Sequence, residues 1–175
     1  IDRFTNVIAL QGDQTVNKGT VVMNQDTTIK YLDTNTDPAD GTQAKDKWGQ
    51  YTGWTRTYKD GDNASLNGLY NDNEWKEQTG EFSTEKGTLN KTSRAYFFRG
   101  YFNVDQASAV NGIHLSFNYK DAVIVYINGQ QLTALNVPDE GYRSQDSGNG
   151  SHKDNMGYGS KETSSSVKTA DLYFR

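Results

Sequence analysis

The clearest hydrophobic pattern in the chain lies between residues 112 and 119. Apolar side chains alternate there with polar ones, with Ile113, Leu115, Phe117 and Tyr119 set against His114, Ser116 and Asn118. A period of two is typical of a β-strand that has one buried and one wet face. The pattern therefore predicts a half-buried strand over Gly112–Tyr119.

A hairpin is predicted directly after this strand. Asn128-Gly129 separates the continuous apolar run Ala122–Ile127 from a second extended stretch, Gln130–Leu135. Asn-Gly favours a type I′ turn, because that turn requires positive φ at both central residues. The first run is rich in β-branched residues and has no polar face, so we expect a strand buried on both sides in the middle of a sandwich.

Short extended stretches recur along the rest of the chain. They are Phe4–Leu10, Val21–Met23, Thr27–Leu32, Ala95–Val104 and Ala170–Phe174. Gly100 interrupts the apolar parity of the fourth stretch and suggests a β-bulge. No segment has a clear helical period, and no repeat of solenoid length is present. The pattern predicts an all-β protein, a two-sheet antiparallel β-sandwich formed as a single domain over residues 1–175.

Composition agrees with this class. The chain has 175 residues, long enough for a sizeable core in one domain. Apolar residues make up only 33% of it, but 11 Tyr, 7 Phe and 3 Trp supply bulk. Seventeen Gly, with many Asn, Asp, Ser and Thr residues, indicate many turns. This combination favours an all-β fold over disorder.

Charge and cysteine content exclude several classes of function. The net charge is −4, with acidic and basic residues mixed and no basic stripe, which argues against a nucleic-acid partner. The absence of cysteine excludes disulfides, thiolate metal sites and thiol catalysis. No apolar run approaches the roughly 18–20 residues of a membrane span. The chain begins at Ile1, so we expect that a targeting signal has been removed.

An acidic loop follows the predicted strand Thr27–Leu32. Within its sequence DTNTDPADG, four residues carry carboxylate or amide oxygens, namely Asp33, Asn35, Asp37 and Asp40. The spacing of the first three copies the start of an EF-hand, but Pro38 replaces the required glycine and Ala44 the bidentate glutamate. An EF-hand is therefore excluded. A calcium site of another kind and an Asx-rich turn that satisfies its own backbone remain as alternatives.

Aromatic residues gather in the next part of the chain. Trp48, Tyr51, Trp54 and Tyr58 lie close together, and Tyr70 falls within the polar, turn-rich stretch Lys59–Asn73. That stretch reads as a long surface loop, where binding residues are often found. Aromatic planes can stack on sugar rings, but they are equally suited to a core. The candidate glycan-binding residues are Trp48, Tyr51, Trp54 and Tyr70, and packing is the alternative role.

Catalytic motifs are missing from the sequence. The chain has no G-x-S-x-G, H-E-x-x-H or Walker loop. Its two histidines are His114, on the polar face of a predicted strand, and His152, in a Gly/Ser-rich loop. Both are interpreted as surface residues. An enzyme is the weakest of the function classes, and we predict a protein without catalytic residues.

Several segments of the chain form motifs that follow one another in a fixed order. They are Lys30-Tyr31-Leu32-Asp33 with Thr36-Asp37-Pro38 and Trp48, Asn73-Glu74-Trp75-Lys76 through Thr79-Gly80-Glu81-Phe82 and Lys86-Gly87, Tyr96-Phe97-Phe98-Arg99 before Phe102, Ala122–Gly129, Gly141-Tyr142, and Asn155-Met156-Gly157-Tyr158-Gly159. In this order they resemble a recurring bacterial module with a galactose-binding-like jelly-roll fold. The resemblance covers residues 27–175 and leaves 1–26 as N-terminal strands or a lead-in. Lys120 departs from the pattern, because it replaces one of a pair of acids before the strand.

The resemblance implies a jelly roll that serves as a non-catalytic accessory module of a secreted or cell-surface bacterial protein. Such modules occur beside secreted metallophosphoesterases and glycoside hydrolases. The expected partners are a polysaccharide or other glycan and the neighbouring domains of a larger protein, with a structural calcium as cofactor. The alternative is a structural spacer or adhesin-type domain without a sugar ligand.

The end of the chain departs from the pattern of this module. The resemblance implies two further strands after the Gly-Tyr-Gly loop, but only Thr169–Phe174 can be matched to either of them. We therefore expect a truncated or re-engineered version of the module, with an open sheet edge near the hairpin. A second copy, a peptide or the segment Asp139–Ser166 would fill such an edge.

Overall fold

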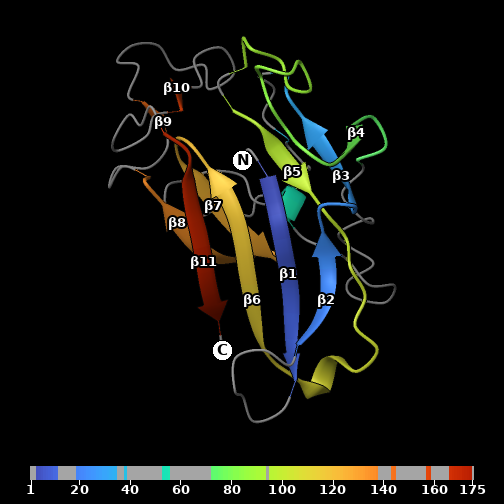
Figure 1. Ribbon diagram of the computed structural model, residues 1–175. Helices are drawn as coiled ribbons and strands as arrows, with labels where there is room; N and C mark the ends of the chain where they lie inside the picture. The colour runs from blue at the N-terminus through green and yellow to red at the C-terminus, as the bar shows by residue number, and fades with distance from the viewer. Residues whose placement is uncertain are drawn as a thin grey trace.

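Figure 1 shows the computed structural model, which describes residues 3–11, 19–34, 38, 53–55, 72–93, 95–137, 143–144, 157–158 and 166–174. These residues contain strands and two short 3-10 helices, Gly53–Thr55 and Ala107–Ala109, but no α-helix. The strands are β1 Arg3–Gln11, β2 Gly19–Asn24, β3 Thr28–Leu32, β4 Lys76–Thr79, β5 Phe97–Arg99, β6 Val110–Tyr119, β7 Val123–Ile127, β8 Gln130–Leu135, β9 Arg143–Ser144, β10 Gly157–Tyr158 and β11 Lys168–Phe174. Every strand pair is antiparallel, so the predicted all-β class is confirmed.

The largest sheet has four strands in the order β11-β6-β1-β2. Its longest strand, β6, confirms the alternation seen in the sequence, because Leu115 and Phe117 are buried while the polar residues His114, Ser116 and Asn118 are only half-buried. β6 pairs with β1 on one side and with β11 on the other, so segments from both ends of the described chain lie beside it. The predicted last strand, Ala170–Phe174, is thus confirmed as part of β11.

The second layer consists of the three-stranded sheet β4-β3-β5 and the hairpin β7-β8, which passes behind β6 and β11 in Figure 1. One core joins the two layers. Its buried members come from both, and they are Met23, Ile29, Tyr31, Phe82, Leu89, Leu115, Phe117, Val123 and Ala170. Two packed antiparallel layers around one core form a β-sandwich, as the sequence predicts. The jelly-roll connectivity stays a prediction.

The hairpin confirms one prediction and corrects another. Asn128 and Gly129 have φ of 49° and 79°, as a type I′ turn requires, and β8 has the predicted bounds. The expectation that Ala122–Ile127 is buried on both sides is wrong. Only Val123 is buried, and the rest of β7 is half-buried, because β7 pairs with β8 alone among the described strands and forms a two-stranded ribbon instead of a central strand.

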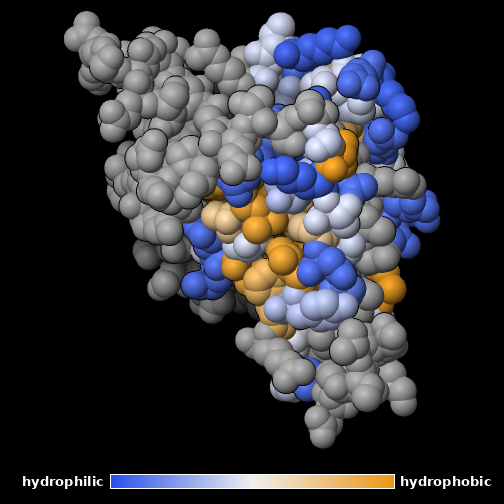
Figure 2. Space-filling view, turned by 60° about the vertical axis from the view of Figure 1, so that its left-hand side comes forward, coloured by the Kyte–Doolittle hydropathy of each residue, from blue (hydrophilic) through white to orange (hydrophobic). Residues whose placement is uncertain are grey.

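The flank that carries β8 and β11 has an apolar centre. Figure 2 shows apolar residues gathered in the middle of the described surface there, with hydrophilic residues beside them. Among the described strands, β8 pairs only with β7, and β11 only with β6. The open edge expected near the hairpin is compatible with this arrangement and stays a prediction, since most of the segment Asp139–Ser166 lies outside the described residues.

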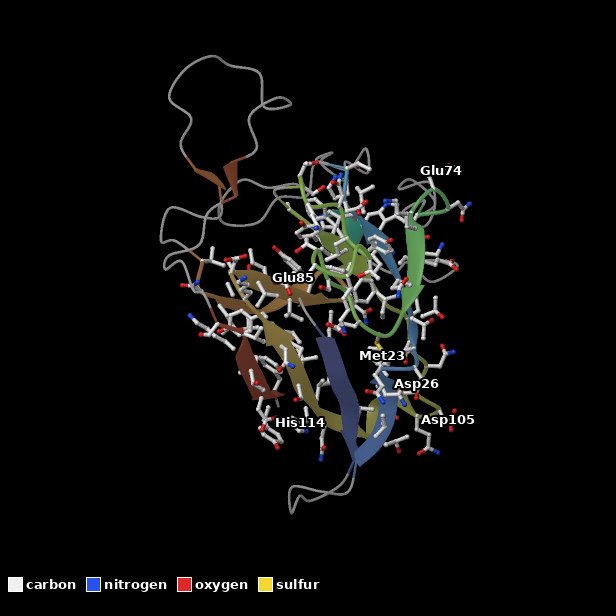
Figure 3. The ribbon with its side chains drawn as sticks, turned by 45° about the horizontal axis from the view of Figure 1, so that its top comes forward. Met23, Asp26, Glu74, Glu85, Asp105 and His114 are labelled. Carbon is white, nitrogen blue, oxygen red and sulfur yellow. The ribbon has the colours of Figure 1, made fainter. Side chains whose placement is uncertain are left out.

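The strand predicted over Ala95–Val104 is shorter in the structure. β5 ends at Arg99, and its pairing with β3 continues without a register shift up to that point, so the bulge suggested at Gly100 is not seen. At Gly100 the backbone packs directly against the core. A Cβ atom there would lie 2.2 Å from Cε of Met23 (labelled in Figure 3) and 2.8 Å from Cδ1 of Ile29. A larger residue at position 100 would therefore force these two core side chains to move.

Replacing Gly100 by alanine should destabilise the protein, because the added methyl group overlaps two core side chains. We expect Gly100→Ala to lower the free energy of unfolding by about 1–3 kcal/mol, measured by urea denaturation. In a Met23→Ala background, which removes the nearest atom, the same substitution should cost less. An equal cost in both backgrounds would show that Met23 is not the obstacle.

Candidate functional site

Asp33 is the first of two buried carboxylates beside β3. It directly follows the strand and is only 1% exposed. Lys76 Nζ donates to its Oδ1 at 2.8 Å, and the backbone N–H of Asn90 donates to its Oδ2 at 2.8 Å. The Asn90 side chain and the Ser93 hydroxyl donate to its carbonyl oxygen. Through these hydrogen bonds, Asp33 connects both β4 and the segment around residue 90 to the end of β3.

This arrangement bears on the predicted calcium site. Of its four ligands, Asn35, Asp37 and Asp40 lie outside the described residues, and both carboxylate oxygens of Asp33 accept hydrogen bonds from the protein. The hydrogen bond to Asp33 is also the main cause of a raised pKa of Lys76, which keeps that ammonium charged. Among the described residues, no three acidic or histidine side chains converge as metal ligands would. The calcium site stays a prediction.

Asp72 is the second buried carboxylate, on the other side of the same sheet. Lys30 Nζ on β3 donates to its Oδ1 at 2.8 Å, and Arg99 Nε on β5 donates to its Oδ2 at 2.9 Å. The Tyr101 hydroxyl also donates to Oδ2 and accepts from Arg99. Burial alone would raise the pKa of Asp72, but the hydrogen bonds from Lys30, Tyr101 and Arg99 outweigh it and hold that pKa below its ordinary value.

The sequence did not indicate this role for Asp72. It lies within the polar stretch Lys59–Asn73, which reads as a surface loop, yet the structure buries it to 7% exposure. A signal was present in Lys30 and Arg99, which are basic residues inside strands predicted from apolar neighbours. A buried cation in such a strand requires an acidic partner. Nothing in the local pattern shows which of the many acids that partner is.

Asp72 should make the stability of the protein depend on pH. A carboxyl whose folded pKa is depressed stabilises the fold above its unfolded pKa of about 3.9, and this stabilisation disappears as the pH falls through the folded pKa. We expect Asp72→Asn to cost about 2–4 kcal/mol at pH 7, and much less at pH 2, in urea denaturation. A cost that does not change between these pH values would contradict an ionised Asp72.

Trp54 is the only predicted glycan-binding residue within the described part of the chain; Trp48, Tyr51 and Tyr70 lie outside it. Its half-buried ring contacts three others. The ring centroids lie 5.3 Å from Phe97, 6.1 Å from Trp75 and 6.1 Å from Tyr126. The 3-10 helix that carries Trp54 is joined to the hairpin turn, because Gly129 N donates to the carbonyl of Thr55 at 3.1 Å. These contacts fix the plane of Trp54 and show that it also contributes to packing.

A third polar and aromatic surface lies on the outer face of β6 and β11. The rings of His114 and Tyr173 stack in parallel, with centroids 4.0 Å apart and an interplanar angle of 6°. Nε2 of His114 hydrogen-bonds to Oδ1 of Asp171. Further along the same pair of strands, the Thr169 hydroxyl donates to Oδ1 of Asn118 at 3.0 Å. The sequence placed His114 on a polar face but did not associate it with Asp171 or Tyr173, which are far away along the chain.

Comparison with known proteins identifies no relative. No protein-family model matches the chain, and neither the curated proteins nor the solved structures include a match. In the described ranges, no helix has the length and apolar character needed to cross a membrane. The resemblance to a galactose-binding-like module therefore depends on the sequence motifs alone.

Proposed function

We propose that this chain is a non-catalytic carbohydrate-binding module of a secreted or cell-surface bacterial protein, and that the surface around Trp54 binds glycan. The proposal depends on one observation about the Trp54 ring. The ring is partly exposed to solvent and also packs against three neighbouring aromatic rings. Trp48, Tyr51 and Tyr70 are proposed as further stacking residues, from their place in the sequence.

The physical reason is preorganisation. A side chain that is already fixed loses little conformational entropy when a ligand binds, so more of the contact energy appears as affinity. Large aromatic planes supply much contact area with only two rotatable side-chain bonds. The attachment of the Trp54 helix to the hairpin turn through Gly129 adds to this rigidity. A rigid plane of this kind supports sugar stacking better than a mobile surface aromatic would.

Two tryptophans of the same cluster allow a matched test. Trp75 is only 7% exposed and therefore acts in packing, so Trp75→Ala should cost about 3–5 kcal/mol of stability. Trp54→Ala should cost less stability and strongly weaken retention of the protein in affinity gels that contain plant, host or bacterial polysaccharides. Trp54→Phe should retain part of the binding. If Trp54→Ala remains folded and is still retained like the original chain, Trp54 does not bind the glycan.

A structural spacer or adhesin-type domain is the second candidate function. The packing contacts of Trp54 favour it, because a residue with three aromatic partners is explained by the fold alone. The buried carboxylates beside β3 also suit a domain whose task is rigidity. A chain that no polysaccharide in the gels retains would favour this function over glycan binding.

Calcium belongs to the proposal as a structural ion. We propose Asp33, Asn35, Asp37 and Asp40 as its oxygen ligands, from their spacing in the sequence. An ion that binds only the folded state stabilises it. We therefore expect millimolar calcium to raise the melting temperature relative to chelator, and Asp40→Asn to remove this shift.

Asp26→Asn provides the control for this measurement, because Asp26 is an exposed acid in the turn before β3. It should leave the calcium shift unchanged. The same melting temperature in calcium and in chelator for the original chain would contradict the calcium site.

A further inference from the structure

The outer face of β6 and β11 presents a second aromatic plane. Tyr173 lies directly opposite His114 in the register of the two strands. Their parallel stack covers one face of the tyrosine ring, but the residue is still 48% exposed. The accessible part of Tyr173 is therefore its other ring face and its edge. β11 is the last strand of its sheet in the described structure, so that ring face is directed past the edge of the sheet.

We propose that this face binds a neutral saccharide, with the pyranose ring stacked on Tyr173 and its hydroxyl groups bonded to Asp171 and neighbouring polar residues. The inference depends on the proposed glycan-binding function, and it assigns part of that function to a surface separate from Trp54. Figure 1 looks onto this face, and no described element passes in front of it.

The plane of Tyr173 is fixed by its neighbours. The hydrogen bond between His114 and Asp171 orients the imidazole, and the imidazole in turn supports the tyrosine ring. In Figure 3, His114 lies beside the end of β11, where this stack is found. The aromatic plane is thus held in place before a ligand arrives, which reduces the entropic cost of binding.

Polar groups suited to a sugar lie next to the plane. Residues on one face of a strand recur about every 7 Å, so Asp171 and then Thr169 follow Tyr173 along β11. Asn118 accepts a hydrogen bond from Thr169 across the strand pair. The side chain of Asp171 is 60% exposed, which leaves its carboxylate accessible to ligand hydroxyls. An aromatic plane beside a few placed polar groups can hold a sugar by stacking and by hydrogen bonds.

The character of the face argues for a saccharide over other partners. A stable protein interface needs a larger apolar centre than a single tyrosine provides. The carboxylate of Asp171 would repel a phosphate backbone, which disfavours nucleic acid. A neutral sugar tolerates the carboxylate, because it offers hydroxyl donors to it.

Histidine signals in proton NMR provide a direct test. The chain has only two histidines, so the imidazole signals of His114 can be followed with His152 as an internal reference. Cellohexaose, xylohexaose and chitohexaose should be titrated into the full chain. We expect at least one of them to shift the His114 signals and not those of His152. If none of the three shifts His114, the inference is wrong.

Matched variants then assign the effect to the ring. Tyr173→Thr keeps a residue suited to a strand but removes the plane, and it should weaken binding of the active oligosaccharide about tenfold or more. Tyr173→Phe should bind like the original chain. Both variants should retain the original melting profile. Equal His114 shifts in Tyr173→Thr and the original chain would overturn the proposal.

The polysaccharide gels separate this inference from the function on which it depends. If a gel retains the original chain and Tyr173→Thr equally but not Trp54→Ala, glycan binding stands and the site on β6 and β11 fails. If no gel retains the original chain, both fail. His114 signals that move with protein concentration in the absence of sugar would identify the face as a contact between two copies, which also overturns the proposal.

Discussion

The burial of charge beside β3 is the constraint on which the arrangement of the second layer depends. Asp33 and Asp72 are both buried, and an unpaired carboxylate in such a place would cost several kcal/mol. Each is therefore surrounded by donors from different parts of the chain. Lys76, Asn90, Lys30 and Arg99 can meet these carboxylates only when β3, β4 and β5 are correctly aligned. The ion pairs therefore penalise any other alignment of the three strands, because a misaligned strand would leave a buried carboxylate without its cation.

Local patterns were sufficient to predict the strands whose faces differ in polarity. The alternation in β6 and the Asn-Gly turn of the hairpin are properties of a few adjacent residues, and both appear in the structure as expected. β4 was not predicted, because its sequence KEQT belongs to a polar edge strand and carries no apolar period. β5 is shorter than predicted, because the apolar run Ala95–Val104 does not record where the pairing with β3 ends.

The sequence predicts the candidate sites less completely than it predicts the fold. The sequence indicates Asp33 as a candidate calcium ligand and Trp54 as a candidate glycan-binding residue. It does not indicate their hydrogen-bond and ring partners, because these are distant along the chain. The pair formed by His114 and Asp171 spans 57 positions and exists only because β11 pairs with β6 in one particular register. A shift by one residue would turn Asp171 and Tyr173 toward the core, and nothing in either segment alone fixes that register.

The position of β6 between β1 and β11 has a consequence for the order in which the protein folds. Residues near position 115 must meet partners near position 7 and near position 172 before the largest sheet is complete. Contacts of such separation close large loops, and proteins dominated by them fold slowly. During synthesis, β6 can pair with β1 as soon as it emerges, but its other edge stays unpaired until β11 has been made. The nascent chain therefore passes through a stage with an open, apolar strand edge, at which association with other chains competes with folding.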